Sequence, residues 1–137
     1  MDAVVLASYI KEIRTIKKIE WTKDEEEEEE ESLEVSQFSY PEYPAVVEGL
    51  FNYLDQQSFY DVNYLDNMEK IQEKALSLFT KEEVKSYLTS LKREERYGDG
   101  VIAEAIESGL FLEALVRLEE ILQKEKIEKE EIKNDKK

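Results

Sequence analysis

A short polar segment in the second half of the chain combines residue types that bind anions. Arg93 and Arg96 lie three residues apart, and Tyr97 and Asp99 follow them directly. The segment is a turn by composition and leads into a predicted helix, whose free N–H groups would carry a partial positive charge. Two guanidinium groups beside that terminus could hold a phosphate or a carboxylate through paired hydrogen bonds. Arg93, Arg96, Tyr97 and Asp99 are therefore the candidate ligand-binding residues.

The same four residues also fit a purely structural interpretation, which the sequence favours. Asp99 is placed to cap the following helix, and capping alone accounts for an aspartate there. In this interpretation Arg96 pairs with a nearby acid and Tyr97 packs in the core. A binding site and a structural turn are therefore both open at this segment.

One acidic run stands out from an otherwise ordinary charge pattern. The chain of 137 residues has 34 acidic and 19 basic residues and a net charge of −15. Eight of the acids form the uninterrupted run 24–31; without it the chain has 26 acids against 19 bases, a net −7. Consecutive like charges repel one another, so residues 24–32 are expected to form an exposed acidic loop. Cation binding, DNA mimicry and recruitment of a basic partner are the functional alternatives for this run.

The residue types that the chain lacks exclude several chemistries. There is no cysteine and no histidine. Disulfides, thiolate catalysis, ordinary zinc sites and Ser-His or Cys-His nucleophilic pairs are therefore ruled out. Any catalysis would rest on carboxylates, Lys, Tyr, Arg or a hard cation, and no metal site or cofactor is predicted.

Charge and hydropathy also bear on the partners and the compartment. Direct nucleic-acid binding is disfavoured, because no basic patch is large enough to offset the negative field. A transmembrane helix needs about 20 apolar residues, and no such stretch is present. The first helix carries four basic residues, but a net acidic protein would be repelled by anionic lipid, so membrane binding is not expected. The N-terminus lacks the pattern of a signal peptide, which favours the cytoplasm.

Helical periodicity indicates the elements that would position these residues. Apolar side chains recur at three- and four-residue spacing, the mark of one buried helix face. Thr80 and Glu83 form a capping box, Gly109 is placed as a left-handed C-terminal cap, and Pro44 suits a first helical turn. Six helices are predicted. The first carries the apolar residues Leu6 to Ile16, and the second begins at Pro44 and ends near Gln56. The third and fourth cover about 63–78 and 81–93, and the last two carry Ile102 to Ile106 and Phe111 to Leu122.

These patterns predict a mainly α fold, a compact bundle of five or six short helices with one small β-hairpin near residues 19–36. The hairpin is expected because residues 19–22 and 33–36 each alternate apolar with polar. Residues 1–123 are interpreted as a single helical domain. Residues 124–137 carry six lysines and five acids with few apolar positions, and are expected to be a tail of frayed helix or disorder.

The second half of the chain resembles an uncharacterised bacterial family, one of the domains of unknown function. The resemblance lies in an R-x-x-R-[FY]-x-[DE]-G block, a short helix, a glycine and a leucine-rich final helix. The matching residues are Arg93, Arg96, Tyr97, Asp99, Gly100, Gly109, Leu112, Leu115 and Leu118. Residues 40–54 resemble the aromatic-proline entry to an earlier helix of that family. The resemblance implies a helical domain and no known reaction.

Two functional hypotheses follow from the sequence. The first is a helical protein–protein interaction or accessory module, acting with a protein partner or as a homodimer, because catalytic residue types are scarce and apolar helix surface is ample. The second is a small anionic-ligand binding protein or enzyme that uses Arg93, Arg96 and Asp99. The sequence ranks the first above the second.

Overall fold

The computed structural model describes residues 1–23, 39–96 and 100–135 of the chain. Within these residues there are six α-helices, one short 3-10 helix and one two-stranded antiparallel sheet. The mainly α fold with a small hairpin is thus confirmed. In chain order the elements are α1 (Ala3–Ile13), β1 (Glu20–Lys23), β2 (Ser39–Glu42), α3 (Ala45–Gln56), α4 (Tyr64–Lys70), η2 (Leu76–Leu78), α5 (Lys81–Glu95), α6 (Val101–Ser108) and α7 (Leu110–Asp135).

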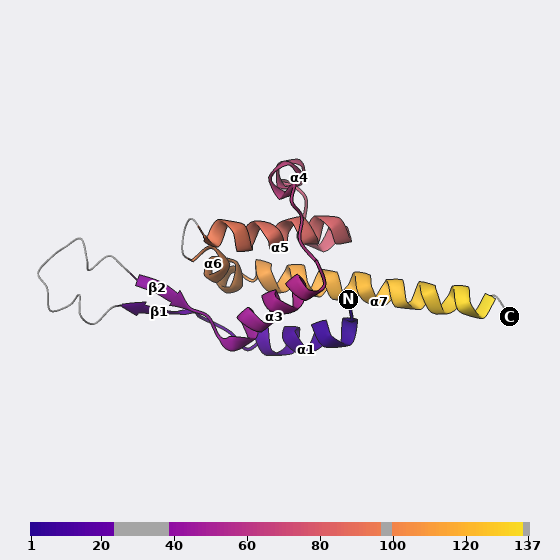
Figure 1. Cartoon of the computed structure of the whole chain (residues 1–137), viewed down its shortest axis with the longest axis horizontal. Coiled ribbons are helices and arrows are strands. Elements are labelled where there is room, and N and C mark those ends of the chain that lie inside the picture. Colours follow the sequence, from indigo (N-terminus) through magenta and orange to yellow (C-terminus); the bar gives the residue numbers. More distant parts are fainter. Residues whose placement is uncertain (24–38, 97–99, 136–137) are drawn as a thin grey trace, which may run out of the picture.

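The long helix α7 organises the packing. Helices α1 and α5 both pack against it, and α6 and η2 contact it as well, while α3 packs on α1. Figure 1 shows α7 between α1 and α5, with its last turns extending beyond the other helices. The hairpin projects at the opposite end of the molecule from the C-terminus, and α4 lies on the outer side of α5.

The core is built from the apolar stripes that the periodicity indicates. Phe111, Leu115 and Leu118 of α7 are fully buried, and Leu6 of α1 is fully buried beside them in the same hydrophobic cluster. Leu88 of α5 belongs to this cluster and is only 2% exposed. The prediction that stripes spaced by one helical turn face one another is therefore confirmed, as expected for short helices that are marginal alone in water.

Two of the capping signals, the Thr80–Glu83 box and the Gly109 cap, are also confirmed, and α3 begins directly after Pro44. The Thr80 hydroxyl accepts a hydrogen bond from the Glu83 backbone N–H at 3.2 Å, and the Glu83 carboxylate accepts one from the Thr80 N–H at 2.8 Å. Lys74 adds an ion pair to the same carboxylate. Gly109 ends α6 with a φ of 86°, a left-handed conformation that glycine adopts without steric cost.

The single helix predicted for residues 63–78 is wrong. The chain leaves the helical conformation after Lys70, passes through a turn and forms η2 against α7. The break allows Ile71 and Leu76 to enter the core, while Leu65 and Leu78 are 67% and 65% exposed. A continuous helix would keep these residues on one straight face. Such a face could not pack against both α5, which α4 contacts, and α7, which η2 contacts.

The predicted hairpin exists, but its second strand is not where the alternation placed it. Strand β1 pairs with residues 39–42, in the register Glu20 to Glu42 and Trp21 to Pro41. Residues 33–36 and the acidic loop of residues 24–32 lie outside the described residues. Pro41 is tolerated because each strand of a two-stranded sheet has a free edge, where no N–H needs to donate. Because Pro41 lies three residues before Pro44, the sequence pattern assigned it to the start of the following helix and not to a strand.

The final helix extends further than its apolar stripe. Helix α7 continues to Asp135, so residues 124–135 are helical in the region where the sequence indicated frayed helix or disorder. Among residues 110–129 of this helix, whose side chains the structure describes, Leu122 is the last buried one, and Ile127 is 54% exposed. Lys81 of α5 forms an ion pair with Glu125 at 3.0 Å, which ties one turn beyond Leu122 to the body.

Gly100, the N-terminal cap of α6, lies close to Trp21 of the hairpin. Its φ is 101°, and a Cβ at this position would lie 2.6 Å from the Trp21 ring. We expect Gly100→Ala to lower the free energy of unfolding by about 2–3 kcal/mol, because backbone strain and a steric clash add together. Urea denaturation and the emission of Trp21, the only tryptophan of the chain, measure the effect.

Gly109→Ala is the matched control for this substitution. Its φ is also positive, at 86°, but apart from the adjoining backbone no atom of the described residues lies within 4 Å of the added Cβ. Gly109→Ala should lower the free energy of unfolding by only about 1 kcal/mol, the cost of the backbone strain. If the two variants lost equal stability, or if Trp21→Ala did not relieve part of the Gly100→Ala effect, the contact with Trp21 would be unimportant.

Candidate functional site

A small pocket lies between α3 and α5, at the N-terminal side of the segment singled out in the sequence. Its volume is about 180 Å³. We call its buried lining residues, which come from both helices and from the loop after α3, the floor of the pocket. Cationic side chains of α5 also line it. The lining residues are Phe51, Leu54, Asp55, Phe59, Tyr60, Leu88, Thr89, Lys92, Arg93 and Arg96. Arg93 and Arg96, two of the four candidate residues, therefore share one pocket.

The three cations of this pocket differ in their partners. Lys92 of α5 forms an ion pair with Asp55 of α3 at 2.5 Å. Arg93 is half-buried and Arg96 is exposed, and neither guanidinium has a hydrogen-bond or ion-pair partner among the residues that the structure describes. The pocket lining thus includes two arginines whose charges have no partner among the described residues, in a chain whose net charge is −15. The expectation that Arg96 pairs with a nearby acid is not met within residues 1–23, 39–96 and 100–135.

The helix N-terminus that was expected to attract an anion is already occupied by the protein itself. The Glu95 carboxylate accepts hydrogen bonds from the backbone N–H groups of Gly100 at 3.0 Å and Ile102 at 2.9 Å. The Tyr43 hydroxyl accepts another from the Ala103 N–H at 3.0 Å. An external anion at the start of α6 would have to displace Glu95. The arginines are therefore available to the α3–α5 pocket rather than to the helix terminus.

The remaining candidate residues, Tyr97 and Asp99, lie outside the described residues. The N-terminal cap of α6 is Gly100, and the carboxylate that reaches its N–H groups belongs to Glu95. Sequence reasoning did not identify Glu95 because it lies on the preceding helix, and its contact with Ile102 spans seven residues. Its double role as a helical residue and as a cap for the next helix has no local sequence signal.

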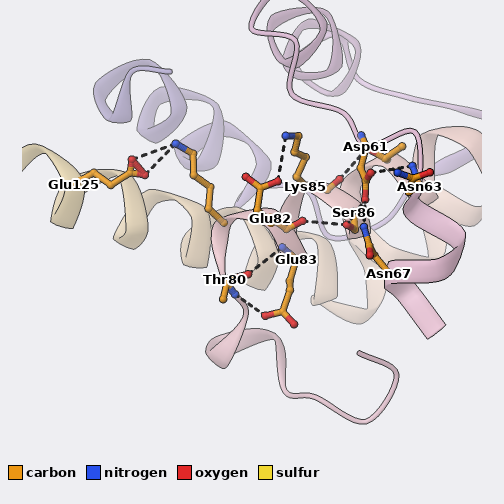
Figure 2. A network of polar contacts seen from close by, with 11 residues as sticks. Asp61, Asn63, Asn67, Thr80, Glu82, Glu83, Lys85, Ser86 and Glu125 are labelled. Carbon is orange, nitrogen blue, oxygen red and sulfur yellow. Dashed lines mark hydrogen bonds and ion pairs between the residues drawn. The ribbon is translucent and has the colours of Figure 1, made fainter. Parts of the chain in front are cut away.

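A second polar cluster anchors the loop before α4. The Asp61 carboxylate accepts hydrogen bonds from the Ser86 hydroxyl at 2.6 Å and from the Asn67 side-chain amide at 2.6 Å. Its other oxygen accepts from the Asn63 backbone N–H at 2.9 Å, and the Asp61 N–H donates to the Thr89 hydroxyl at 2.9 Å. Figure 2 shows Ser86 of α5, Asn67 and Asn63 gathered around the Asp61 carboxylate. Both hydroxyl residues are buried, so this loop is held by specific polar contacts.

The hydrogen bonds of this cluster keep Asp61 ionised. The Ser86 hydroxyl is the largest cause of a pKa below the ordinary 3.8, and the Asn67 amide and the Asn63 N–H lower the pKa of Asp61 further. Burial acts in the opposite direction, and the positive charge of Lys85 adds a smaller favourable effect. Asp61 is therefore a structural anion whose carboxylate accepts hydrogen bonds from Ser86, Asn67 and Asn63.

Large apolar side chains are exposed beside this anchor. Tyr60, Val62 and Leu65 are 47%, 76% and 67% exposed. Helix α4, all of which the structure describes, has no buried residue. We call Tyr60, Val62 and Leu65 the α4 surface. The sequence did not indicate it, because Leu65 fits the apolar period of the helix predicted for residues 63–78.

Residues 1–23, 39–96 and 100–135 contain neither a metal-binding cluster nor a membrane-spanning helix. No three acidic side chains there converge on a point where they could hold a metal ion. None of the helices in this part of the chain combines the length and the apolar character needed to cross a bilayer.

Comparison with known proteins gives a family and no activity. No curated protein and no solved structure matches the chain. One family, described as a family of unknown function (DUF6508), matches residues 2–124 and so covers every described element from α1 to α6 and half of α7. The match agrees with the resemblance noted from the sequence to an uncharacterised family. The chain therefore belongs to the DUF6508 family of unknown function.

Proposed function

We propose that this protein is a helical interaction module whose α4 surface binds a basic, amphipathic segment of another protein. The observation that carries the proposal is the contrast between the anchor and the surface. Asp61 fixes the loop through four hydrogen bonds, while the neighbouring Val62 and Leu65 remain in water. A segment held this firmly with its large apolar side chains outside is suited to present them to a partner.

The charges around the α4 surface indicate the kind of partner. Asp66, Glu69 and Glu73 are exposed close to it in the chain, and Lys70 is the one exposed base between them. A partner segment with apolar side chains flanked by Lys or Arg would be complementary in both hydropathy and charge. A second copy of this chain would bring two acidic surfaces together, each on a protein of net charge −15. A different, basic protein is therefore favoured over a homodimer.

The proposal is tested with the full chain as bait in extracts of the native host, followed by binding of the purified partner. We expect Val62→Ser combined with Leu65→Ser to weaken binding at least tenfold, since each buried interface side chain contributes on the order of 1 kcal/mol or more. Binding should also weaken as salt rises, because charge complementarity contributes to it. Isothermal titration calorimetry at two salt concentrations measures both effects.

Leu78→Ser is the matched control, because Leu78 is as exposed as Leu65 but lies at the end of η2, which packs against α7. It should leave the affinity unchanged. Light scattering after gel filtration should give a monomer for the isolated chain. A purified partner that binds the double variant as tightly as the wild type would refute the proposed surface. So would a dimer that dissociates on the Val62 and Leu65 substitutions, because the surface would then serve self-association.

A further inference from the structure

We infer that the α3–α5 pocket binds a small organic acid, with an apolar group of about one side chain's size in the pocket and its carboxylate on Arg93 and Arg96. The inference goes beyond the proposed interaction function and rests on different residues. The pocket and the α4 surface share Tyr60, which the test below leaves unchanged.

The floor of the pocket selects an apolar group. Phe51, Leu54, Phe59 and Leu88 are each buried to 91% or more and supply rings and methyl groups. The one polar group among the buried lining residues is the Thr89 hydroxyl, and it is already used twice. It accepts from the Asp61 N–H and donates to the Lys85 carbonyl oxygen at 2.8 Å. A free phosphate would therefore find no donor at the floor of the pocket.

The cationic side selects a carboxylate. Lys92 is neutralised by Asp55, so the charge available to a ligand comes from Arg93 and Arg96. Two acids, Glu94 and Glu95, lie between them in sequence. Glu95 directs its carboxylate to the start of α6, and Glu94 is exposed and does not line the pocket. A half-buried guanidinium without a partner is unfavourable, and a planar carboxylate offsets this cost through bidentate hydrogen bonds.

The size of the pocket limits the ligand. Pockets for drug-sized ligands have volumes of roughly 300–1,000 Å³, whereas this pocket has about 180 Å³. One phenyl or branched alkyl group fills such a space. The same chemistry occurs in a free aromatic or branched-chain acid and at the C-terminus of a peptide that ends in an apolar residue. The experiment distinguishes these two sources.

The probe is 3-phenylpropionate, titrated into the full-length, isotope-labelled protein and followed by NMR. We expect amide shifts on α3 and α5 around the pocket, and at least tenfold weaker binding for 3-phenylpropionamide, which lacks the charge. Inorganic phosphate, which lacks the apolar group, should also bind at least tenfold more weakly. Equal binding of the acid and the amide, equal binding of phosphate, or no binding of the acid at millimolar concentration would overturn the inference.

Variants locate the site. Arg93→Gln and Arg96→Gln should each weaken binding of the acid at least tenfold and should fold normally, because neither side chain has a partner within the described residues. Arg14→Gln is the control, since Arg14 is exposed at the end of α1, far from the lining residues in the chain. Unchanged binding in both pocket variants would refute the site. A peptide with a free C-terminal Phe that binds more tightly than 3-phenylpropionate, and loses binding on amidation, assigns the carboxylate to a peptide; otherwise it belongs to a small acid.

Discussion

Phe111→Ala is expected to lower the free energy of unfolding by about 3–5 kcal/mol, the largest effect that we predict for this chain. Phe111 is fully buried near the start of α7, and its ring lies 5.8 Å from that of Phe51 of α3, centroid to centroid. Truncation removes apolar surface from the core and leaves a cavity that the surrounding helices can fill only in part. Because α7 contacts α1, α5, α6 and η2, the loss should weaken the whole fold.

Urea denaturation followed by far-UV circular dichroism measures this loss. Domains are typically stable by only 5–15 kcal/mol, so the alanine variant can be partly unfolded without denaturant. Phe111→Leu, with an expected cost of about 1–2 kcal/mol, keeps the comparison measurable. Leu110→Ala is the control, because Leu110 precedes Phe111 in the chain but is 45% exposed. Its truncation should lower the free energy of unfolding by less than about 1 kcal/mol. Equal costs at the two positions would contradict the assigned core.

Asp61→Ala is expected to lower the free energy of unfolding by about 2–3 kcal/mol, an effect similar to that of Gly100→Ala. The substitution removes the acceptor for the Asn63 N–H, the Asn67 amide and the Ser86 hydroxyl. Of these donors Ser86 is buried, Asn67 is half-buried and Asn63 is exposed, and the Ser86 hydroxyl keeps another acceptor, the Glu82 carbonyl oxygen. The expected cost is therefore mainly the loss of three hydrogen bonds to a charged acceptor. Asp66→Ala is the control, because Asp66 is exposed on α4 and should change stability by less than about 0.5 kcal/mol.

The pH dependence of the Asp61 effect has a definite sign. Its folded pKa lies below 3.8, so the ionised form is more favourable in the folded protein than in the unfolded chain. The resulting stability is fully present above the unfolded pKa and is lost as the pH falls through the folded one. The difference in unfolding free energy between wild type and Asp61→Asn should therefore be constant from pH 7 to about 5 and shrink below about pH 4. A difference that grew on acidification would show that Asp61 is not held as a carboxylate.

The Asp61 experiments also bear on the interaction proposal. If the anchor presents the α4 surface, Asp61→Ala should increase hydrogen exchange in residues 61–70 before it affects α7, because its partners lie on α4 and α5 and none lies on α7. Loss of partner binding in Asp61→Ala with Val62 and Leu65 intact would then reflect a mobile surface. The Val62 and Leu65 substitutions remove the proposed contacts with the partner. The two kinds of variant therefore distinguish the positioning of the α4 surface from the contacts that it makes.

The sequence by itself determined those features whose causes lie within one or two helical turns. The capping box is formed by residues three apart, so Thr80 and Glu83 fix the start of α5 whatever else the chain does. Gly109 ends α6 for a reason contained in its own backbone. The apolar periods of α1, α3 and α5 predicted the buried faces, because a stripe at helical spacing has no other way to leave water. Helix content and core residues followed from these local rules.

Only the tertiary structure decided the features that join distant segments. Asp61 meets Ser86 and Thr89 across 25 and 28 residues, and no local pattern links them. The chain breaks after Lys70 because its next apolar residues must reach the core beside α7, a demand that a straight helical period does not contain. Glu95 accepts hydrogen bonds from the first N–H groups of α6. The pocket is lined both by Arg93 and Arg96 and by aromatic side chains of α3 and the loop after it. Such contacts depend on how helices pack against one another, and packing is decided jointly by all their faces.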